Sequence, residues 1–253
     1  MAQIGYGYGS EYQLMRFLGH HRNLLEERIS KGLNETGIFR WLDFGFDDPM
    51  NSISGDKEIK GLSFLKELDL PAEIVNNAID KYHKLGINDI DNWQNWDAIF
   101  TLNGTVYLVE AKAHVSELSS GNKEHGGKSK EAIRNLFEEQ LQNNGLYEFT
   151  INDAWLKEYY QLANRLAIAA FLNECAIKTK VLYIYFINGY NKRIVENQKI
   201  YEVYNKNANK KEFEKAILKE KKALSILDKD SVNLLLAAPI FIKADSKEYE
   251  DEA

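Results

Sequence analysis

Residues 96–114 read WDAIFTLNGTVYLVEAKAH, and the fold is decided in this stretch. Asn103-Gly104 separates two apolar-rich runs. This is the strongest short-range signal for a β-hairpin, because a type I′ turn needs positive φ at both of its central residues. With the turn at these two residues, Asp97 lies directly opposite Glu110. We therefore predict a tight hairpin with one defined register.

The hairpin sorts its side chains onto two faces, because successive residues of a strand point in opposite directions. Glu110, Lys112 and His114 share the face that carries Asp97. The other face is expected to enter a packing layer and carries Ala98, Phe100, Val109, Ala111 and Ala113.

Two carboxylates that face each other across a ladder have Cβ atoms roughly 5 Å apart and repel. Folding does not require such a pair, whereas a divalent cation would make it favourable, since Mg²⁺ prefers hard oxygen ligands. An acid followed by Glu-x-Lys on the next strand suits metal-assisted phosphodiester hydrolysis. In that chemistry the carboxylates hold the metal, and the lysine orients a water or steadies the phosphate.

Acid-x-Lys by itself has little specificity. The chain contains three other copies, at residues 58–60, 220–222 and 245–247. Only the Glu110 copy lies within an apolar strand with an acid placed opposite. The alternative interpretation is an edge hairpin with a solvated charged face.

Asp97 together with Glu110-Ala111-Lys112 resembles the core of the PD-(D/E)XK, or restriction-endonuclease-like, phosphodiesterase superfamily, with Trp96 in place of the proline before the first acid. The resemblance implies an α/β fold with an αβββαβ core, in which helices flank a central mixed β-sheet. It further implies a nuclease that uses Mg²⁺, with Mn²⁺ as a substitute, and whose partner is a nucleic acid, for which we expect DNA.

The same resemblance implies roles for individual residues. The implied metal ligands are Asp97, Glu110, the backbone carbonyl of Ala111, and Glu11. Lys112 would orient the nucleophilic water, and Gln161 corresponds to a glutamine that several branches of the superfamily carry in the helix after the catalytic strands. Glu11 and Gln161 would complete the catalytic set.

The N-terminal part predicts one long helix. Ser10-x-x-Gln13 has the spacing of a capping box, and the apolar period continues to about residue 31, with Gly32 as the residue after the helix. Glu11, in the first turn, either compensates the helix dipole or is the helix-borne acid of the superfamily. His21 and Arg22 either face solvent or contact a phosphate.

Residues 155–174 predict a helix that packs across the sheet. On an apolar background Gln161, Asn164 and Arg165 share one face. This face either points at the metal site or forms a partly buried polar seam. The loop directly after the hairpin, residues 116–130, is rich in Gly, Ser and Lys. It either closes over a substrate backbone or is a solvated linker, and an amphipathic helix is predicted after it over 131–142. The expected substrate contacts are His114, Arg165, Asn164, His21, Arg22 and Lys128.

The remaining patterns complete a single domain over residues 1–244. Residues 38–42 and 181–188 predict strands, the second of them central, and 232–242 predict a buried strand that Pro239 ends or bends. An insertion at roughly 43–92 reads as helical near its end, and 210–225 as a charged helix. The acidic residues 245–253 are expected to be a disordered tail.

Composition narrows the classes of function. The net charge is −6 in 253 residues with a pI near 5.5, which argues against broad non-specific nucleic-acid binding. A single cysteine excludes a disulfide framework, and neither a signal peptide nor a transmembrane run is evident, so we expect a cytoplasmic protein without a membrane partner. A homodimer remains open. The alternatives to a nuclease are a catalytically inactive nucleic-acid- or protein-binding member of the same fold, and a metal hydrolase acting on a small phosphoester.

Overall fold

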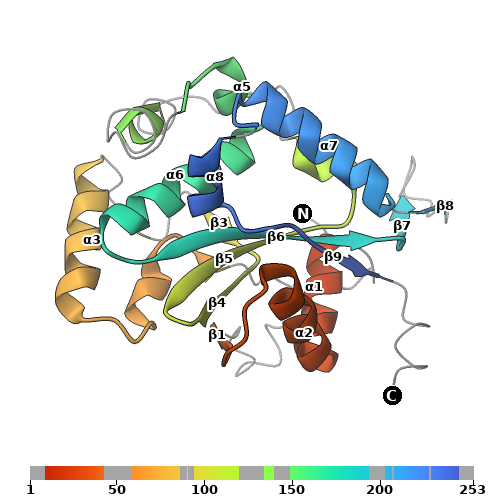
Figure 1. The fold of residues 1–253 in the computed structure, drawn as a ribbon, viewed down its shortest axis with the longest axis horizontal. Helices are drawn as coiled ribbons and strands as arrows, with labels where there is room; N and C mark the ends of the chain where they lie inside the picture. The colour runs from red at the N-terminus through yellow and green to blue at the C-terminus, as the bar shows by residue number, and fades with distance from the viewer. Residues whose placement is uncertain are drawn as a thin grey trace.

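A computed structural model describes residues 9–42, 59–85, 90, 94–119, 134–139, 149–193, 203–206, 208–227 and 229–244, with 190–193 and 203–206 as backbone only. The predicted acidic tail, most of the 116–130 loop with Lys128, and the first part of the expected insertion lie outside these residues. The architecture is α/β: helices cover both faces of a mixed five-stranded sheet (Figure 1).

The central sheet has the order β1-β4-β5-β6-β9, with β1 at Arg40–Leu42, β4 at Ala98–Leu102, β5 at Thr105–Lys112, β6 at Thr179–Ile187 and β9 at Ile240–Lys243. β4 runs antiparallel to both of its neighbours, while β5, β6 and β9 are parallel. Two small antiparallel pairs lie beside it: β2 (Ile59–Lys60) with β3 (Asn95–Trp96), and β7 (Tyr190–Arg193) with β8 (Val203–Lys206). The expected central position of the 181–188 strand is confirmed.

The predicted hairpin register is confirmed. Ala98 pairs with Val109, and the ladder continues residue by residue to Leu102 opposite Thr105. Asn103 and Gly104 have φ values of 49° and 73°, the positive pair that a type I′ turn requires. The ladder therefore brings Asp97, the residue before β4, next to the end of β5.

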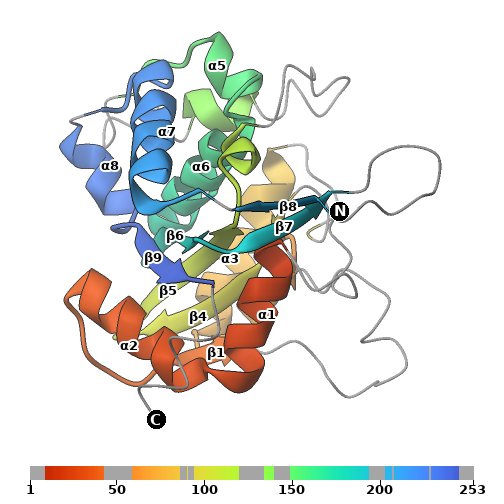
Figure 2. The same ribbon diagram turned by 90° about the vertical axis from the view of Figure 1, so that its right-hand side faces the viewer.

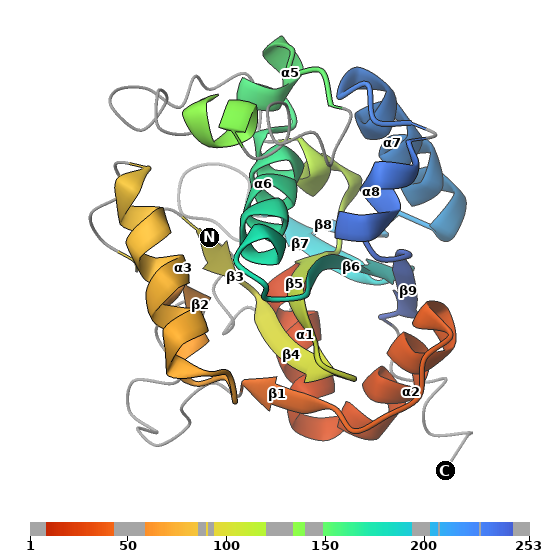
Figure 3. The ribbon, with the colours of Figure 1, turned by 60° about the vertical axis from the view of Figure 1, so that its left-hand side comes forward.

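Each face of the sheet carries its own hydrophobic cluster. On one face, α1 (Ser10–His20) and α2 (Arg22–Leu33) pack on a cluster that includes the expected packing layer. Phe17 of α1, for example, lies 5.5 Å from Phe186 of β6 between ring centroids. On the other face, α6 (Tyr160–Glu174) lies between α3 (Ala72–Lys84) and α8 (Asp230–Leu235) (Figures 1 and 3). Figure 2 shows the helices on the two faces of the sheet from another side, with α5 (Asp153–Leu156) and α7 (Lys210–Ala223) above the sheet. Two short 3₁₀ helices, η2 (Ser63–Lys66) and η3 (Val115–Leu118), and a helical segment at 134–139 lie in the connections between these elements.

The predicted single N-terminal helix is wrong in three respects. The chain breaks at His21, whose φ and ψ are −132° and 34°, so that two helices form. Gly9 is the N-cap and no side chain caps the helix, so the Ser10 capping box is not formed. The second helix ends at Asn34 in the left-handed region, whereas Gly32 lies inside it, where an added Cβ would collide with the side chain of Ile240. Gly32 thus serves the close approach of α2 to β9.

The predicted strand over 232–242 is also wrong in its first half. Residues 230–235 form α8, and β9 begins only after Pro239. Val232 and Leu235 are buried at helical spacing while Leu234 is 59% exposed. A short apolar run does not distinguish a strand from a buried helix, because either can bury it.

Gly104 and Gly19 allow a matched test of the turn, since an added Cβ meets nothing within 4 Å at either position. Gly104→Ala should destabilise the fold by about 1–2 kcal/mol, because φ is +73° there and a Cβ is strained in that region. Gly19→Ala, inside α1, should instead be neutral or stabilising by up to about 1 kcal/mol. Denaturant unfolding of both variants measures the difference. Equal effects would contradict the turn assignment.

Candidate active site

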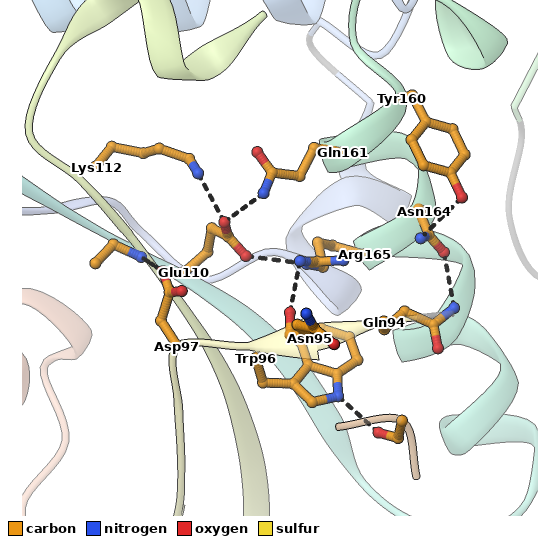
Figure 4. Close-up of polar contacts among 12 residues, drawn as sticks. Gln94, Asn95, Trp96, Asp97, Glu110, Lys112, Tyr160, Gln161, Asn164 and Arg165 are labelled. Atoms are coloured by element: carbon orange, nitrogen blue, oxygen red, sulfur yellow. Dashed lines mark hydrogen bonds and ion pairs between the residues drawn. The ribbon is translucent and has the colours of Figure 1, made fainter. Parts of the chain in front are cut away.

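Asp97 lies between β3 and β4, two consecutive strands that pair with different neighbours. Trp96 in β3 pairs with β2, whereas Ala98 in β4 pairs with β5. At this bend the Oδ2 atom of Asp97 accepts the backbone N–H of Ala111 at 2.6 Å (Figure 4). The carboxylate is therefore fixed beside the residue that follows Glu110. The expectation that hairpin register brings the two acids together is confirmed.

The environment of Asp97 favours the protonated form. Burial, and then the charge of Glu110, raise the pKa of Asp97 to about 8, although Lys112, the Ala111 N–H and Arg165 act in the opposite direction. An acid with no ligand in this position is costly to ionise, as expected for neighbouring carboxylates in a poorly solvated site.

Glu110 is surrounded by donors. It is 3% exposed, and its Oε1 accepts the Nζ of Lys112 at 2.6 Å and the Nε2 of Gln161 at 2.6 Å. Its Oε2 accepts the Nε of Arg165 at 3.0 Å. Burial works to raise the pKa of Glu110, but the two cations outweigh it and hold the pKa below its usual range. Glu110 is therefore ionised at neutral pH.

Lys112 ends β5 and is equally buried, at 5% exposed. Burial disfavours its charged form, but Glu110 and Asp97 more than compensate and raise the pKa of Lys112. The side chain is thus a protonated ammonium group that can orient a water or an anion, rather than a base that removes a proton.

Helix α6 supplies the rest of the polar groups at the site. The predicted 155–174 helix forms as two helices, α5 and α6. Gln161, Asn164 and Arg165 were expected either to point at the metal site or to form a polar seam, and the structure shows both arrangements. Gln161 and Arg165 point at Glu110. Asn164 belongs to a polar seam instead: its Oδ1 accepts the Nε2 of Gln94 at 3.0 Å, and its Nδ2 donates to the hydroxyl of Tyr160 at 3.3 Å.

Arg165, expected as a substrate contact, is locked into the protein. Its Nη2 donates to the carbonyl of Asn95 at 2.7 Å, and its guanidinium carbon lies 4.7 Å from the centroid of the Trp96 ring. Trp96 in turn donates from Nε1 to the Gly61 carbonyl at 2.8 Å. Trp96, which stands where the motif of the PD-(D/E)XK superfamily has a proline, therefore forms the platform under Arg165.

The other predicted residues that the structure describes lie on α1, on α2 or at η3. Glu11 is in the first turn of α1, on the face of the sheet opposite α6. Arg22 donates to the Leu18 carbonyl at 3.1 Å, and the His21 ring packs 5.6 Å from that of Phe17. His114 caps η3, where its Nδ1 accepts the N–H of Ser116 at 3.1 Å. These contacts show local structural roles for His21, Arg22 and His114.

The position of Glu11 nevertheless remains compatible with the site. The Nη2 of Arg16, in the middle of α1, donates at 3.0 Å to the carbonyl of Ala244, just after β9, while α2 packs at Ile240, where β9 begins. The first turn of α1 is thus directed toward the ends of the parallel strands at which Lys112 lies. A role for Glu11 beside the metal stays a prediction.

Sequence reasoning missed Glu220. This residue of α7 is 3% exposed, and in the part of the chain that the structure describes its carboxylate makes no hydrogen bond. Burial raises its pKa to about 8, partly opposed by Lys112. After burial, the charge of Glu220 also helps to raise the pKa values of Tyr183 and Tyr185, the β6 neighbours of Glu110 and Lys112. The sequence could have indicated its burial, because residue 220 is seven residues after Phe213 and four before Leu224, and these spacings place all three on the buried face of the helix.

The donor set can accept one divalent cation. Asp97 has a second carboxylate oxygen with no hydrogen-bond partner among the described residues, and Glu110 Oε2 accepts only one donor there. Hard oxygens of this kind suit Mg²⁺. In the described residues, however, no three or more His, Cys, Asp or Glu side chains gather in a metal-binding group, so the protein would supply few of the ligands.

Comparisons of the chain with protein-family models, with curated proteins and with solved structures found no match. Across the described residues, no helix combines the length and apolar character needed to cross a membrane.

The pKa of Asp97 predicts how stability depends on pH. The shift from 3.8 to about 8 means that Asp97 adds stability at low pH, which is lost as pH rises toward 8. Asp97→Asn keeps an acceptor for Ala111 without the charge. It should therefore raise the melting temperature more at pH 9 than at pH 5, in chelator-treated protein.

The control for this variant is Asp69→Asn, because the Asp69 side chain is 99% exposed. Its effect on melting should not vary between the two pH values. A pH-independent effect of Asp97→Asn would show that Asp97 is an ordinary solvated acid.

Proposed function

We propose that the protein is a divalent-metal-dependent nuclease that hydrolyses phosphodiester bonds in DNA. One observation carries the proposal: a tight hairpin brings Asp97 beside Glu110, and the ammonium group of Lys112 lies 2.6 Å from Glu110. Asp97 and Glu110 would hold Mg²⁺ or Mn²⁺, together with the carbonyl of Ala111. The metal would polarise the phosphate and lower the pKa of a bound water.

The residues of the chain have complementary tasks in this proposal. Lys112 stays charged and lies at the end of β5, so it can hold a water or a phosphate oxygen in line. Gln161 fixes Glu110 through Oε1, which leaves the free electron pairs of the carboxylate pointing in a defined direction. Holding Glu110 in one position as a metal ligand matters, because small displacements of reacting groups reduce the reaction rate by large factors.

The fold supports the restriction-endonuclease-like assignment. The order of the core elements is α1 and α2, β1, β4, β5, α6, β6, which corresponds to the αβββαβ order that the resemblance implies. β2, η2 and α3 fall between β1 and β4, where the insertion is expected, and α3 gives it the helical character that was predicted.

A second candidate is a catalytically inactive member of the same fold that binds nucleic acid or protein. Two observations favour it. Arg165 already neutralises Glu110, and the net charge of −6 opposes binding to a polyanion. Metal binding separates the candidates, because an inactive binder needs no cation at Asp97 and Glu110.

Lys112→Ala should reduce cleavage of plasmid and single-stranded DNA in Mg²⁺ or Mn²⁺ by at least about 100-fold, the typical loss when one group that stabilises the transition state is removed. Single-turnover cleavage measures the loss. RNA of the same sequence serves as a parallel substrate.

Lys222→Ala is the matched control, because Lys222 belongs to one of the chance acid-x-Lys copies and is exposed on α7. It should cleave at the rate of the unchanged protein. Metal-dependent cleavage that survives equally in both variants would assign the activity to a contaminant or to another site. No cleavage of any nucleic acid by the unchanged protein would favour the inactive binder.

A further inference from the structure

Arg165 places a permanent positive charge beside the candidate metal ligands. Its Nε bonds to Glu110 at 3.0 Å, its Nη2 to the Asn95 carbonyl at 2.7 Å, and its guanidinium lies over Trp96. The residue is 6% exposed. A guanidinium held in this way cannot turn toward a substrate, and it does not lose its proton in proteins.

Two cations, Lys112 and Arg165, therefore accompany the two candidate metal ligands, Asp97 and Glu110. When a cation displaces the proton of Asp97, Asp97 and Glu110 carry two negative charges, and Lys112 and Arg165 balance them. Without Arg165 the site would have a negative excess that attracts a divalent cation. With Arg165 a divalent cation alone leaves an uncompensated positive charge in a poorly solvated region, where repulsion is strongest.

A phosphate group supplies the missing negative charge. We propose that Arg165 couples the binding of the divalent cation to the binding of the phosphate-bearing substrate, so that the site takes the cation weakly alone and tightly together with a phosphate anion. This inference rests on the proposed nuclease function and adds how the metal is recruited. Linkage requires that the cation strengthen phosphate binding by the same factor.

The coupling is measurable without turnover. Thymidine 5′-monophosphate has no phosphodiester bond to cleave, so calorimetric titration of Mn²⁺ with and without it reports binding alone. We expect Mn²⁺ to bind at least about tenfold more tightly in its presence, and the nucleotide to bind more tightly by the same factor in the presence of Mn²⁺. Asp97→Asn should remove the Mn²⁺ signal and so locate it at this site.

Variants of Arg165 test the origin of the coupling. Arg165→Gln removes the charge and should tighten the binding of Mn²⁺ alone by about tenfold or more, so that the nucleotide no longer enhances it. Arg165→Lys retains the charge and should keep the weak binding of Mn²⁺ alone. Arg40→Gln is the control for net charge, because Arg40 is 71% exposed and takes no part in the site. Circular dichroism and melting confirm that each variant is folded.

The outcomes separate this inference from the function on which it rests. Tight binding of Mn²⁺ to the unchanged protein without nucleotide would overturn the coupling and leave the nuclease proposal standing. Coupling that persists in folded Arg165→Gln would overturn the role of Arg165. Should Arg165→Gln fail to fold, the reciprocity of the two ligands and the Arg165→Lys variant still decide. Absence of Mn²⁺ binding with the nucleotide and with single-stranded DNA would overturn both proposals.

Discussion

An ionised carboxylate inside a protein is tolerated only when its charge and its lone pairs are satisfied, and Glu110 is the third residue from the end of a fully buried strand. Its satisfaction requires Lys112 from the same strand and Gln161 and Arg165 from α6. This requirement fixes α6 in rotation and in position along β5. Arg165 also bonds to the Asn95 carbonyl of β3, so the ion pair with Glu110 aligns β3 and β5 with α6, which is distant from both in the sequence.

The alignment extends beyond the ion pairs. Asn164, one turn below Gln161 on α6, accepts from Gln94, and Gln94 accepts from the hydroxyl of Tyr82 on α3 at 3.0 Å. Helix α3 of the insertion is therefore joined to α6 by a buried chain of hydrogen bonds, in addition to hydrophobic contact. In a low-dielectric interior such a chain is strong when complete and costly when broken, which favours a single arrangement of α3, α6 and β3.

The sequence predicted the features that depend on local rules. Asn103-Gly104 determined the turn, the turn determined the register, and alternation then placed Asp97 and Glu110 together. The face shared by Gln161 and Arg165 followed from helical spacing. Features that depend on distant partners were not predictable in the same way. Gly32 ended no helix because it faces Ile240, and the run before Pro239 became helical because Val232 and Leu235 reach the core that way. Whether Asn164 faced the metal or a seam depended on Gln94, outside the helix altogether.

Folding accounts for most of the charged cluster, but not for all of it. Glu110 is required by two cations that would otherwise be buried alone, so Glu110, Lys112 and Arg165 could persist as a structural unit. Asp97 differs. Its only hydrogen bond among the described residues comes from the N–H of Ala111. An asparagine would accept this bond equally well without the cost that raises the pKa of Asp97 to about 8. The negative charge of Asp97 therefore has no structural explanation in the described residues, and a cation brought in with an anionic substrate is the simplest chemistry that would use it.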